Sequence, residues 1–395
     1  MIAVSPFLWM LSGFPMTLAV CLLTRNEADK LDRVLGSVAG VADELIVADT
    51  GSTDATVEKA QALGARVVSA TWDDDFSHGR NQALDQVTSE WILWLNPDEE
   101  LDPASRPVLK ACMNQAQTLA WFVRVHELSL ADSGAFTETV QPRLFRNRCG
   151  VRYRGRLHPG FETPLEELAV RHGLSLGVSE ARIRHHAYLS KLTADKLRWA
   201  VRLLEKELDD RPGQLHFMIE LGRTLLLLNN ARGHQVLAEA ATQVLRSLDA
   251  PAAPTPTVGS LLEYVLTSPG GDKNPITRTQ AHELARRWFA ATPPVVWAAA
   301  ASEFHAGRVA EAIPLLERLI QLGQTGQYDR SAAFEPHIIG GLAWQNLGIC
   351  YAKLEDWGRA ELCFGKLLTL PEFKTNGMQH YAWVQQQKQK APPAR

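Results

Sequence analysis

The stretch T-L-A-V-C-L-L-T-R-N-E, residues 17–27, indicates the fold class of the first part of the chain. A run suited to a buried strand gives way to polar residues, and apolar residues then recur at helical spacing from Leu31 to Val38. The same order of strand, polar turn and helix repeats further along, with strand-like runs at 44–48, 65–70 and 90–95. Short connections between such units predict an α/β domain with a mostly parallel sheet covered by helices.

The rest of the first domain is less regular. We expect a third helix with Ser77 as its N-cap that carries Val87, and a mixture of strand-like and loop segments between residues 106 and 188. From Lys191 onward helical spacing dominates. An acid-rich run on the first of these helices, residues 205–210, is typical of a solvated helix face.

A repeat pattern lies near the C-terminus. It matches the tetratricopeptide signature W-x2-L-G-x2-Y, A-x3-F and P position by position, at Trp344, Leu347, Gly348, Tyr351, Ala360, Phe364 and Pro371. Weaker copies surround residues 297–316 and 217–222. Three helix pairs suffice for a short solenoid, so we expect an all-α domain behind the sheet domain. Any helical hairpin with an aromatic core is the alternative for the final repeat.

Length and composition predict more than one domain. The 395 residues exceed one ordinary domain, and 46% hydrophobic with 22% charged residues is typical of globular proteins. Met16 is an alternative start to Met1. We expect an N-terminal extension (1–15), the α/β domain (16–190), a linker with the first repeat-like helices (191–250), a Pro/Gly-rich connection (251–276) and the tetratricopeptide-like domain (277–390).

Charge and cysteine content argue against several classes of function. A net charge of −3 gives no basic excess for binding a nucleic acid. The five cysteines are scattered without a C-x-x-C pair, which favours reduced thiols over a zinc site or disulfides. The apolar N-terminus lacks the basic start of a signal peptide, and no later stretch reaches the roughly 18 to 20 apolar residues of a membrane span. We therefore expect a cytoplasmic protein.

Polar residues follow every predicted strand of the first domain, at 24–27, 49–54, 72–75 and 96–100. In open α/β sheets the ligand lies outside the carboxyl ends of the strands, so we expect these residues to share one crevice. Clustered carboxylates suit a hard divalent cation that bridges them to a diphosphate. Asp98 is the best-placed metal ligand, and a helix N-cap or a surface turn is its structural alternative.

Four ordered motifs stand in this part of the chain: L-L-T-R-N-E (22–27), V-A-D-T-G-S-T-D (47–54), W-D-D-D-F-S-H-G-R-N (72–81) and W-I-L-W-L-N-P-D-E (91–99). Together they resemble glycosyltransferase family 2, in the branch that carries tetratricopeptide repeats behind a GT-A domain. The resemblance covers roughly the first 230 residues, and four motifs in this order are specific. It implies an enzyme that transfers a sugar from a nucleotide diphosphate sugar to an acceptor, with Mg²⁺ or Mn²⁺, by one inverting displacement.

The resemblance also implies roles for individual residues. Asp49 would contact the nucleoside base, and Arg80 would lie on the nucleotide side. Asp98, the second acid of the D-x-D-like element, would hold the metal. The other donor-side residues would be Thr24, Asn26 and Glu27 after the first strand, and Asn96, which replaces the family's first acid and can hydrogen-bond a ribose hydroxyl.

One motif departs from the family pattern. Residues 155–159 read Gly-Arg-Leu-His-Pro where the family has Gly-x-x-His-Glu, so the usual catalytic base is missing. Glu162 is the nearest replacement as base, and a solvated loop acid is the equal alternative. His158 is expected to support the metal or the acceptor, and His185 to contact the site, against the alternative of structural histidines.

Two other functions stay open. A catalytically degenerate protein could bind the nucleotide sugar while its repeats recruit partners, since Asn96 and Pro159 replace family acids. A nucleotidyltransferase should carry a glycine-rich basic loop after the first strand, which residues 24–27 lack. The helical array predicts a protein or peptide partner by analogy with other solenoids, and the sugar and the acceptor stay unassigned.

Overall fold

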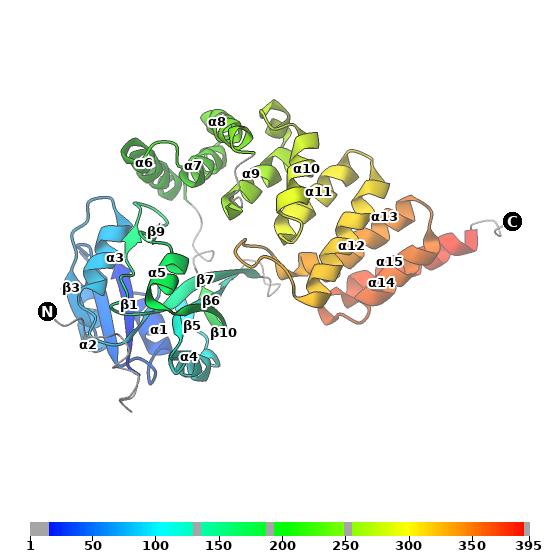
Figure 1. The fold of residues 1–395 in the computed structure, drawn as a ribbon. Helices are drawn as coiled ribbons and strands as arrows, with labels where there is room; N and C mark the ends of the chain where they lie inside the picture. Colours follow the sequence, from blue (N-terminus) through cyan, green and yellow to red (C-terminus); the bar gives the residue numbers. More distant parts are fainter. Residues whose placement is uncertain (1–15, 129–135, 187–192, 249–254, 391–395) are drawn as a thin grey trace. The chain divides into compact units, whose positions relative to one another are not determined.

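The structure is a computed structural model that describes residues 16–128, 136–186, 193–248 and 255–390 (Figure 1). The chain divides into two compact units, residues 1–210 and 211–395. The sequence suggested a boundary near residue 190, whereas helix α6 (Ala194–Asp210) groups with the first unit. The expected N-terminal extension lies outside the described residues.

The first unit is built on an eight-stranded sheet. In sheet order the strands are β3 (Arg66–Ser69), β2 (Glu44–Asp49), β1 (Leu18–Thr24), β4 (Trp91–Trp94), β7 (Phe136–Arg146), β6 (Thr118–Leu128), β10 (Ser175–His185) and β5 (Glu99–Leu101). Strands β1 to β4 are parallel, as are β6 and β10. β7 is antiparallel to β4 and β6, and β5 is antiparallel to β10. The predicted α/β class with a mostly parallel sheet is confirmed.

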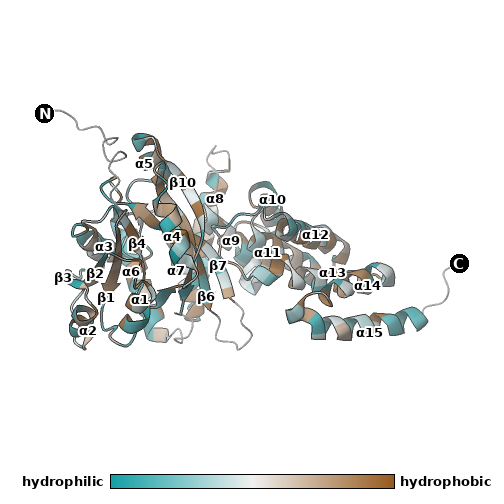
Figure 2. Cartoon of the chain, turned by 90° about the horizontal axis from the view of Figure 1, so that it is seen from below, coloured by the Kyte–Doolittle hydropathy of each residue, from teal (hydrophilic) through white to brown (hydrophobic). Residues whose placement is uncertain are grey.

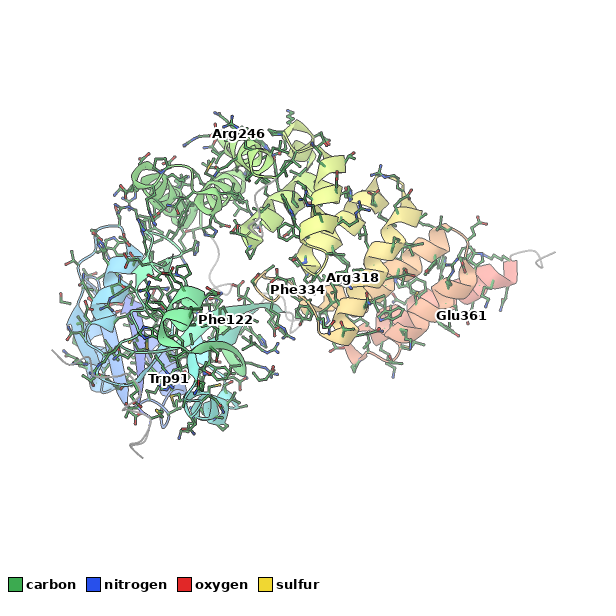
Figure 3. All side chains as sticks on the ribbon, viewed as in Figure 1. Trp91, Phe122, Arg246, Arg318, Phe334 and Glu361 are labelled. Atoms are coloured by element: carbon green, nitrogen blue, oxygen red, sulfur yellow. The ribbon has the colours of Figure 1, made fainter. Side chains whose placement is uncertain are left out.

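Helices cover both faces of the sheet. One face carries α1 (Leu31–Ser37), α2 (Thr56–Ala62) and α4 (Ser105–Met113), which share a core with one set of alternate residues of β1. The other face carries α3 (Phe76–Leu84) and α5 (Leu165–His172), which pack on the other set. A strand buried on both faces is apolar throughout, as the brown β1 and β4 of Figure 2 show. Trp91, at the start of β4, is fully buried (Figure 3).

Helix α3 differs from its prediction, and the segment expected to mix strand-like and loop parts is more regular than expected. Helix α3 begins at Phe76 and ends at Leu84, with Asp75 as its N-cap and Ser77 donating to it. The segment predicted as irregular contains the three long strands β6, β7 and β10. In β10 polar residues alternate with buried ones, and β7 contains Pro142 at an irregularity of its pairing with β6. Both features weaken the strand pattern, since proline cannot donate to the ladder. A small hairpin, β8 (Tyr153–Arg154) with β9 (Gly160–Phe161), completes the unit.

The second unit is helical. Its helices are α7 (Leu215–Leu227), α8 (Arg232–Arg246), α9 (Pro256–Thr267), α10 (Arg278–Trp288), α11 (Pro293–His305), α12 (Val309–Thr325), α13 (Gly341–Lys353), α14 (Trp357–Leu367) and α15 (Lys374–Lys390). The predicted final repeat corresponds to α13 and α14, and the weaker copies to α11 with α12 and to α7. Helix α9 lies inside the segment expected to be a connection. Pro256 occupies its first turn, where proline needs no N–H partner.

Two further findings concern cysteines and membrane segments. All five cysteines are free, and four of them are buried. Within the described ranges, no helix is long and apolar enough to cross a membrane.

The close approach of α13 and α14 predicts a stability effect at Gly348. A Cβ at this position would lie 2.6 Å from the ring of Phe364, which is fully buried. Gly348→Val should therefore lower the free energy of unfolding of the helical unit by about 1–3 kcal/mol, measured by urea titration. Gly358→Val on α14 is the matched control, because a Cβ there meets only one atom, at 3.8 Å. Equal effects of the two variants would contradict the packing account.

Candidate active site

Two loops at the carboxyl edge of the sheet are joined by hydrogen bonds. After β1, the Asn26 N–H donates to Ser52 Oγ (2.8 Å), and the Thr53 N–H donates to Asn26 Oδ1 (2.7 Å). The Glu27 N–H donates to Thr56 Oγ1 (2.8 Å). Asn26 has a φ of 56°, in the left-handed region that asparagine tolerates better than most residues. The turn after β1 and the loop after β2 therefore form one connected rim.

The Asp49 carboxylate orders this rim. One oxygen accepts the N–H groups of Gly51 (3.0 Å) and Ser52 (2.8 Å). The other accepts the hydroxyls of Ser52 and Thr24, the latter at 3.3 Å. A carboxylate offers about four acceptor sites, and all are used here. A nucleoside base would therefore have to displace one of these contacts to bind Asp49. Thr24 is buried, and its hydroxyl helps to orient the Asp49 carboxylate.

Arg80 extends from α3 to the end of β4. Its guanidinium lies over the rings of Trp94 (4.9 Å to the centroid) and Tyr153 (4.8 Å). Arg80 Nη2 is 3.5 Å from Asn96 Oδ1. Each cation–π contact contributes about 0.5–2 kcal/mol, so the guanidinium is held in one orientation. Arg80 and Asn96, predicted from separate motifs, share one subsite.

A buried carboxylate shapes the turn between β4 and β5. Glu99 has no exposed surface, and its carboxylate accepts from Arg143 Nη2 at 2.6 Å. The same carboxylate accepts the Asn96 N–H (2.7 Å) and Asn96 Nδ2 (3.2 Å). β5 pairs with β10, so that Glu99 lies opposite His185. These contacts fix the turn that carries Asp98.

Asp98 lies beside the end of β10. Its Oδ1 is 3.4 Å from His185 Nε2, and Nδ1 of the same ring is 3.9 Å from Glu127. The His186 N–H donates to the Asp98 carbonyl (2.8 Å). Burial opposes ionisation of Asp98, but the hydrogen bond and the charge of His185 outweigh it and hold its pKa below the usual value. Burial likewise opposes protonation of His185, and its contacts with Asp98, Glu99 and Glu127 nevertheless raise its pKa.

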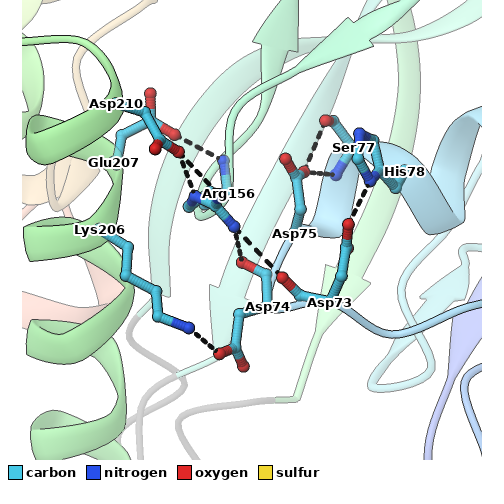
Figure 4. Close-up of polar contacts among 9 residues, drawn as sticks. All are labelled: Asp73, Asp74, Asp75, Ser77, His78, Arg156, Lys206, Glu207 and Asp210. Carbon is cyan, nitrogen blue, oxygen red and sulfur yellow. Dashed lines mark hydrogen bonds and ion pairs between the residues drawn. The ribbon is translucent and has the colours of Figure 1, made fainter.

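The W-D-D-D acids do not join this group. Asp73 pairs with His78 at 2.6 Å, and Asp75 caps α3 through the Ser77 N–H (2.7 Å). Asp74 pairs with Arg202 (3.2 Å) and Lys206 of α6, as Figure 4 shows for the lysine. Each of these three acids has a structural partner, and their expected place in the crevice stays a prediction.

His158 and Glu162 lie on and beside the β8–β9 hairpin. His158 is exposed in the connection between the two strands and has a φ of 48°. Glu162 follows β9, its side chain is exposed, and its N–H donates to the Arg152 carbonyl (2.8 Å). The ring of Phe161, next to Glu162, stacks on Tyr153 at 5.1 Å. Because Tyr153 also contacts Arg80, the hairpin adjoins the Arg80 subsite.

Asp98 and His185 offer donors that suit a divalent cation. Carboxylate oxygens suit Mg²⁺, and imidazole nitrogen is an additional donor for transition metals. In the part of the chain that the structure describes, no group of three or more His, Cys, Asp or Glu side chains is arranged to hold a metal ion. Mg²⁺ in phosphate sites commonly uses one or two carboxylates, with phosphate and water as its other ligands. A pair of protein ligands therefore fits a cation that binds together with a diphosphate.

Comparison with known proteins assigns this domain. Residues 19–132 match the family model described as Glycosyl transferase family 2. This part of the chain is therefore similar to glycosyltransferase family 2. Strands β2 and β4, all of β1 except Leu18, and Asp49, Arg80 and Asp98 lie within the matched residues.

Relatives of the family 2 domain occur in several bacteria. A TPR repeat-containing protein of Synechococcus elongatus is 34% identical over 223 residues, 53% of this chain and 52% of that protein. An uncharacterized glycosyltransferase of Rickettsia bellii is 33% identical over 133 residues, 32% of this chain and 42% of the relative. The chain thus spans 52% or less of these two relatives. The structure of S. aureus TarS 1-349 with UDP-GlcNAc is 16% identical, with a TM-score of 0.33 over 80% of this chain and 93% of that chain.

Three residues that shape the candidate site were not predicted: Glu99, Arg143 and Tyr153. Glu99 follows Asp98 directly, but its burial depends on Arg143, which stands on a strand that the sequence pattern did not reveal. Tyr153 lies on a two-residue strand, too short for a periodic signal. Arg143 directly precedes the buried Leu144 and Phe145 in β7, and an arginine beside buried apolar residues is a local signal for a buried acid.

The buried pair predicts a large stability effect. Arg143→Met should lower the free energy of unfolding of the first unit by about 3 kcal/mol, because the Glu99 carboxylate is left buried without its cation. The double variant Arg143→Met/Glu99→Gln should recover part of this loss, since the neutral amide is cheaper to bury. Urea unfolding of both variants measures the difference. A single variant as stable as the wild type would contradict the role given to the pair.

Proposed function

We propose that this protein transfers a sugar from a nucleotide diphosphate sugar to an acceptor, with inversion and with Mg²⁺ or Mn²⁺ on the diphosphate. The observation that carries the proposal is the 3.4 Å approach of Asp98 and His185 at the carboxyl edge of the family 2 sheet. This is the edge where open α/β sheets bind ligands. The fixed guanidinium of Arg80 adjoins it through Asn96.

The donor side binds and orients the nucleotide. Arg80 offers guanidinium N–H groups held by two aromatic rings. Asn96 would offer its amide to a ribose hydroxyl. The rim around Asn26 and Asp49 encloses the nucleoside end. A cation bound by Asp98 and His185 would neutralise charge on the diphosphate leaving group. Asp98 is suited to this because its pKa is held low.

The acceptor side is the β8–β9 hairpin. Glu162 would accept the proton of the attacking acceptor hydroxyl as general base. Its carboxylate is exposed and free to reach a bound acceptor. His158, in the connection before it, would hydrogen-bond the acceptor. The contacts from Phe161 through Tyr153 to Arg80 support this arrangement, because they join the hairpin to the donor side.

The first test is thermal stabilisation by nucleotide diphosphates and their sugars, with and without Mn²⁺. A ligand at about 100 times its Kd should stabilise the protein by about 2.7 kcal/mol. The Mn²⁺-dependent part should disappear in Asp98→Ala, because that variant lacks the carboxylate ligand. Asp73→Asn is the matched control, because Asp73 pairs with His78 and should leave the effect unchanged. Mn²⁺-dependent stabilisation of equal size in Asp98→Ala would refute the metal role. Binding of a nucleotide sugar without any turnover would favour the scaffold function instead.

The second test separates the candidate bases. Glu162→Gln should lower kcat by about 10²- to 10⁴-fold, the usual contribution of a general base. Glu166→Gln on α5 is the matched control, since Glu166 is exposed and lies in the following helix. Full kcat in Glu162→Gln together with its loss in His158→Asn would assign the base to His158.

A further inference from the structure

Helix α6, the last helix of the first unit, contacts the rest of that unit at two places that lie far apart in the sequence. These places are Arg156 and the turn after β3. Figure 4 shows acidic and basic side chains of α6 meeting Arg156 and the turn after β3. Glu207, in the run expected to be a solvated face, is instead buried, with 1% of its surface exposed. Its carboxylate accepts the Arg156 N–H at 2.8 Å. The solvated-face expectation was therefore wrong for Glu207.

The backbone of Arg156 is held from both sides. Its N–H donates to Glu207, and its carbonyl accepts the Phe76 N–H at 3.0 Å, from the first residue of α3. The Arg156 side chain adds an ion pair with Asp210 at 2.7 Å and hydrogen bonds to the carbonyls of Asp73 (3.2 Å) and Asp74 (3.4 Å). One residue thus joins α6, the turn after β3 and the start of α3.

An aromatic cluster supports the same junction. Trp199 of α6 stacks on Trp72, with ring centroids 6.3 Å apart, and meets Phe76 edge-on at 5.7 Å. Lys206 and Arg202 pair with Asp74 on the same turn. The attachment of α6 therefore combines apolar burial with directed charge contacts, which together give a single docked position.

The loop that α6 contacts, residues 155–159, carries His158 of the proposed acceptor side. Arg156 stands two positions before His158, in the loop 155–159 that joins β8 to β9. Both Gly155 and His158 have positive φ, 122° and 48°. A non-glycine residue in the left-handed region persists only where its surroundings hold it. The contacts from Glu207 and Phe76 to Arg156 supply that restraint.

We infer that α6 sets the position of the acceptor-side loop and that Glu207 is the positioning residue. This inference rests on the proposed function, because it assigns the loop 155–159 to the acceptor. Glu207 acts through Arg156, without touching the substrate. The helix that follows the sheet domain is thus part of the catalytic unit.

Beyond the start of α3, the donor side has further anchors, and α6 makes none of these contacts. Asn81 exchanges two hydrogen bonds with the Tyr153 backbone, both at 2.9 Å, and the Trp94 ring holds Arg80 from β4. Loss of Glu207 should therefore disturb the acceptor side while donor binding persists. A loss of folding would affect both sides equally.

The test compares Glu207→Ala, Glu207→Gln and the control Asp209→Asn, an exposed acid on the same helix. Hydrogen exchange at the Arg156 amide reports directly on its hydrogen bond to Glu207. It should quicken in Glu207→Ala, whereas Glu207→Gln should keep its protection because the amide oxygen still accepts the N–H. Steady-state kinetics should show kcat lowered at least about tenfold in Glu207→Ala, with the donor KM within about twofold, and rescue in Glu207→Gln. Asp209→Asn should match the wild type in both measurements.

Unchanged exchange at Arg156 in Glu207→Ala would overturn the inference, as would faster exchange with unchanged kcat. A parallel loss of kcat and donor binding would show a general structural defect and would overturn it too. A wild-type protein that transfers no sugar would refute the proposed function and, with it, the kinetic role of Glu207. Exchange at Arg156 would still decide separately whether α6 holds the loop.

Discussion

The site depends on one buried carboxylate, that of Glu99. Removing a carboxylate from water costs several kcal/mol unless a cation and N–H donors replace the lost hydration. Arg143 supplies the cation at 2.6 Å, and Asn96 supplies the backbone donor at 2.7 Å. Because these partners come from β7 and from the turn itself, the turn has one low-energy arrangement. This arrangement of the turn fixes the position of Asp98.

The acids of the first unit differ in what surrounds them. Asp49 and Asp75 accept backbone N–H groups and order local turns. Asp74 faces two cations of α6. Asp98 faces an imidazole at 3.4 Å and keeps part of its surface exposed. Asp98 thus differs from Asp49, Asp74 and Asp75 in having a histidine as its side-chain partner, as Asp73 also has, and it differs from Asp73 in lying beside the buried Glu99.

The strands that could be predicted from the sequence are those with a clear local hydrophobic pattern. Strands β1, β2 and β4 are contiguous apolar runs because they are buried on both faces, and their polar ends mark the ligand edge. β10 alternates, with one face polar, and β7 contains Pro142, so periodicity did not reveal them. The approach of His185 to Asp98 depends on the pairing of β5 with β10, which joins residues more than eighty positions apart. Glu207 was misread because acids at helical spacing usually face water, and only its contact with Arg156 shows otherwise.

The position of α6 bears on where the catalytic unit ends. A protein that stopped near residue 190 would contain every strand of the sheet, and by pattern it would be a whole domain. It would lack the acceptor for the Arg156 N–H, the cations that face Asp74 and the ring that stacks on Trp72. An unpaired N–H, an Asp74 carboxylate without its two cations and exposed tryptophan surface all favour a different arrangement of the loop 155–159. Since that loop carries His158 and leads to Glu162, the geometry of the proposed acceptor side depends on a helix that the sheet itself does not require.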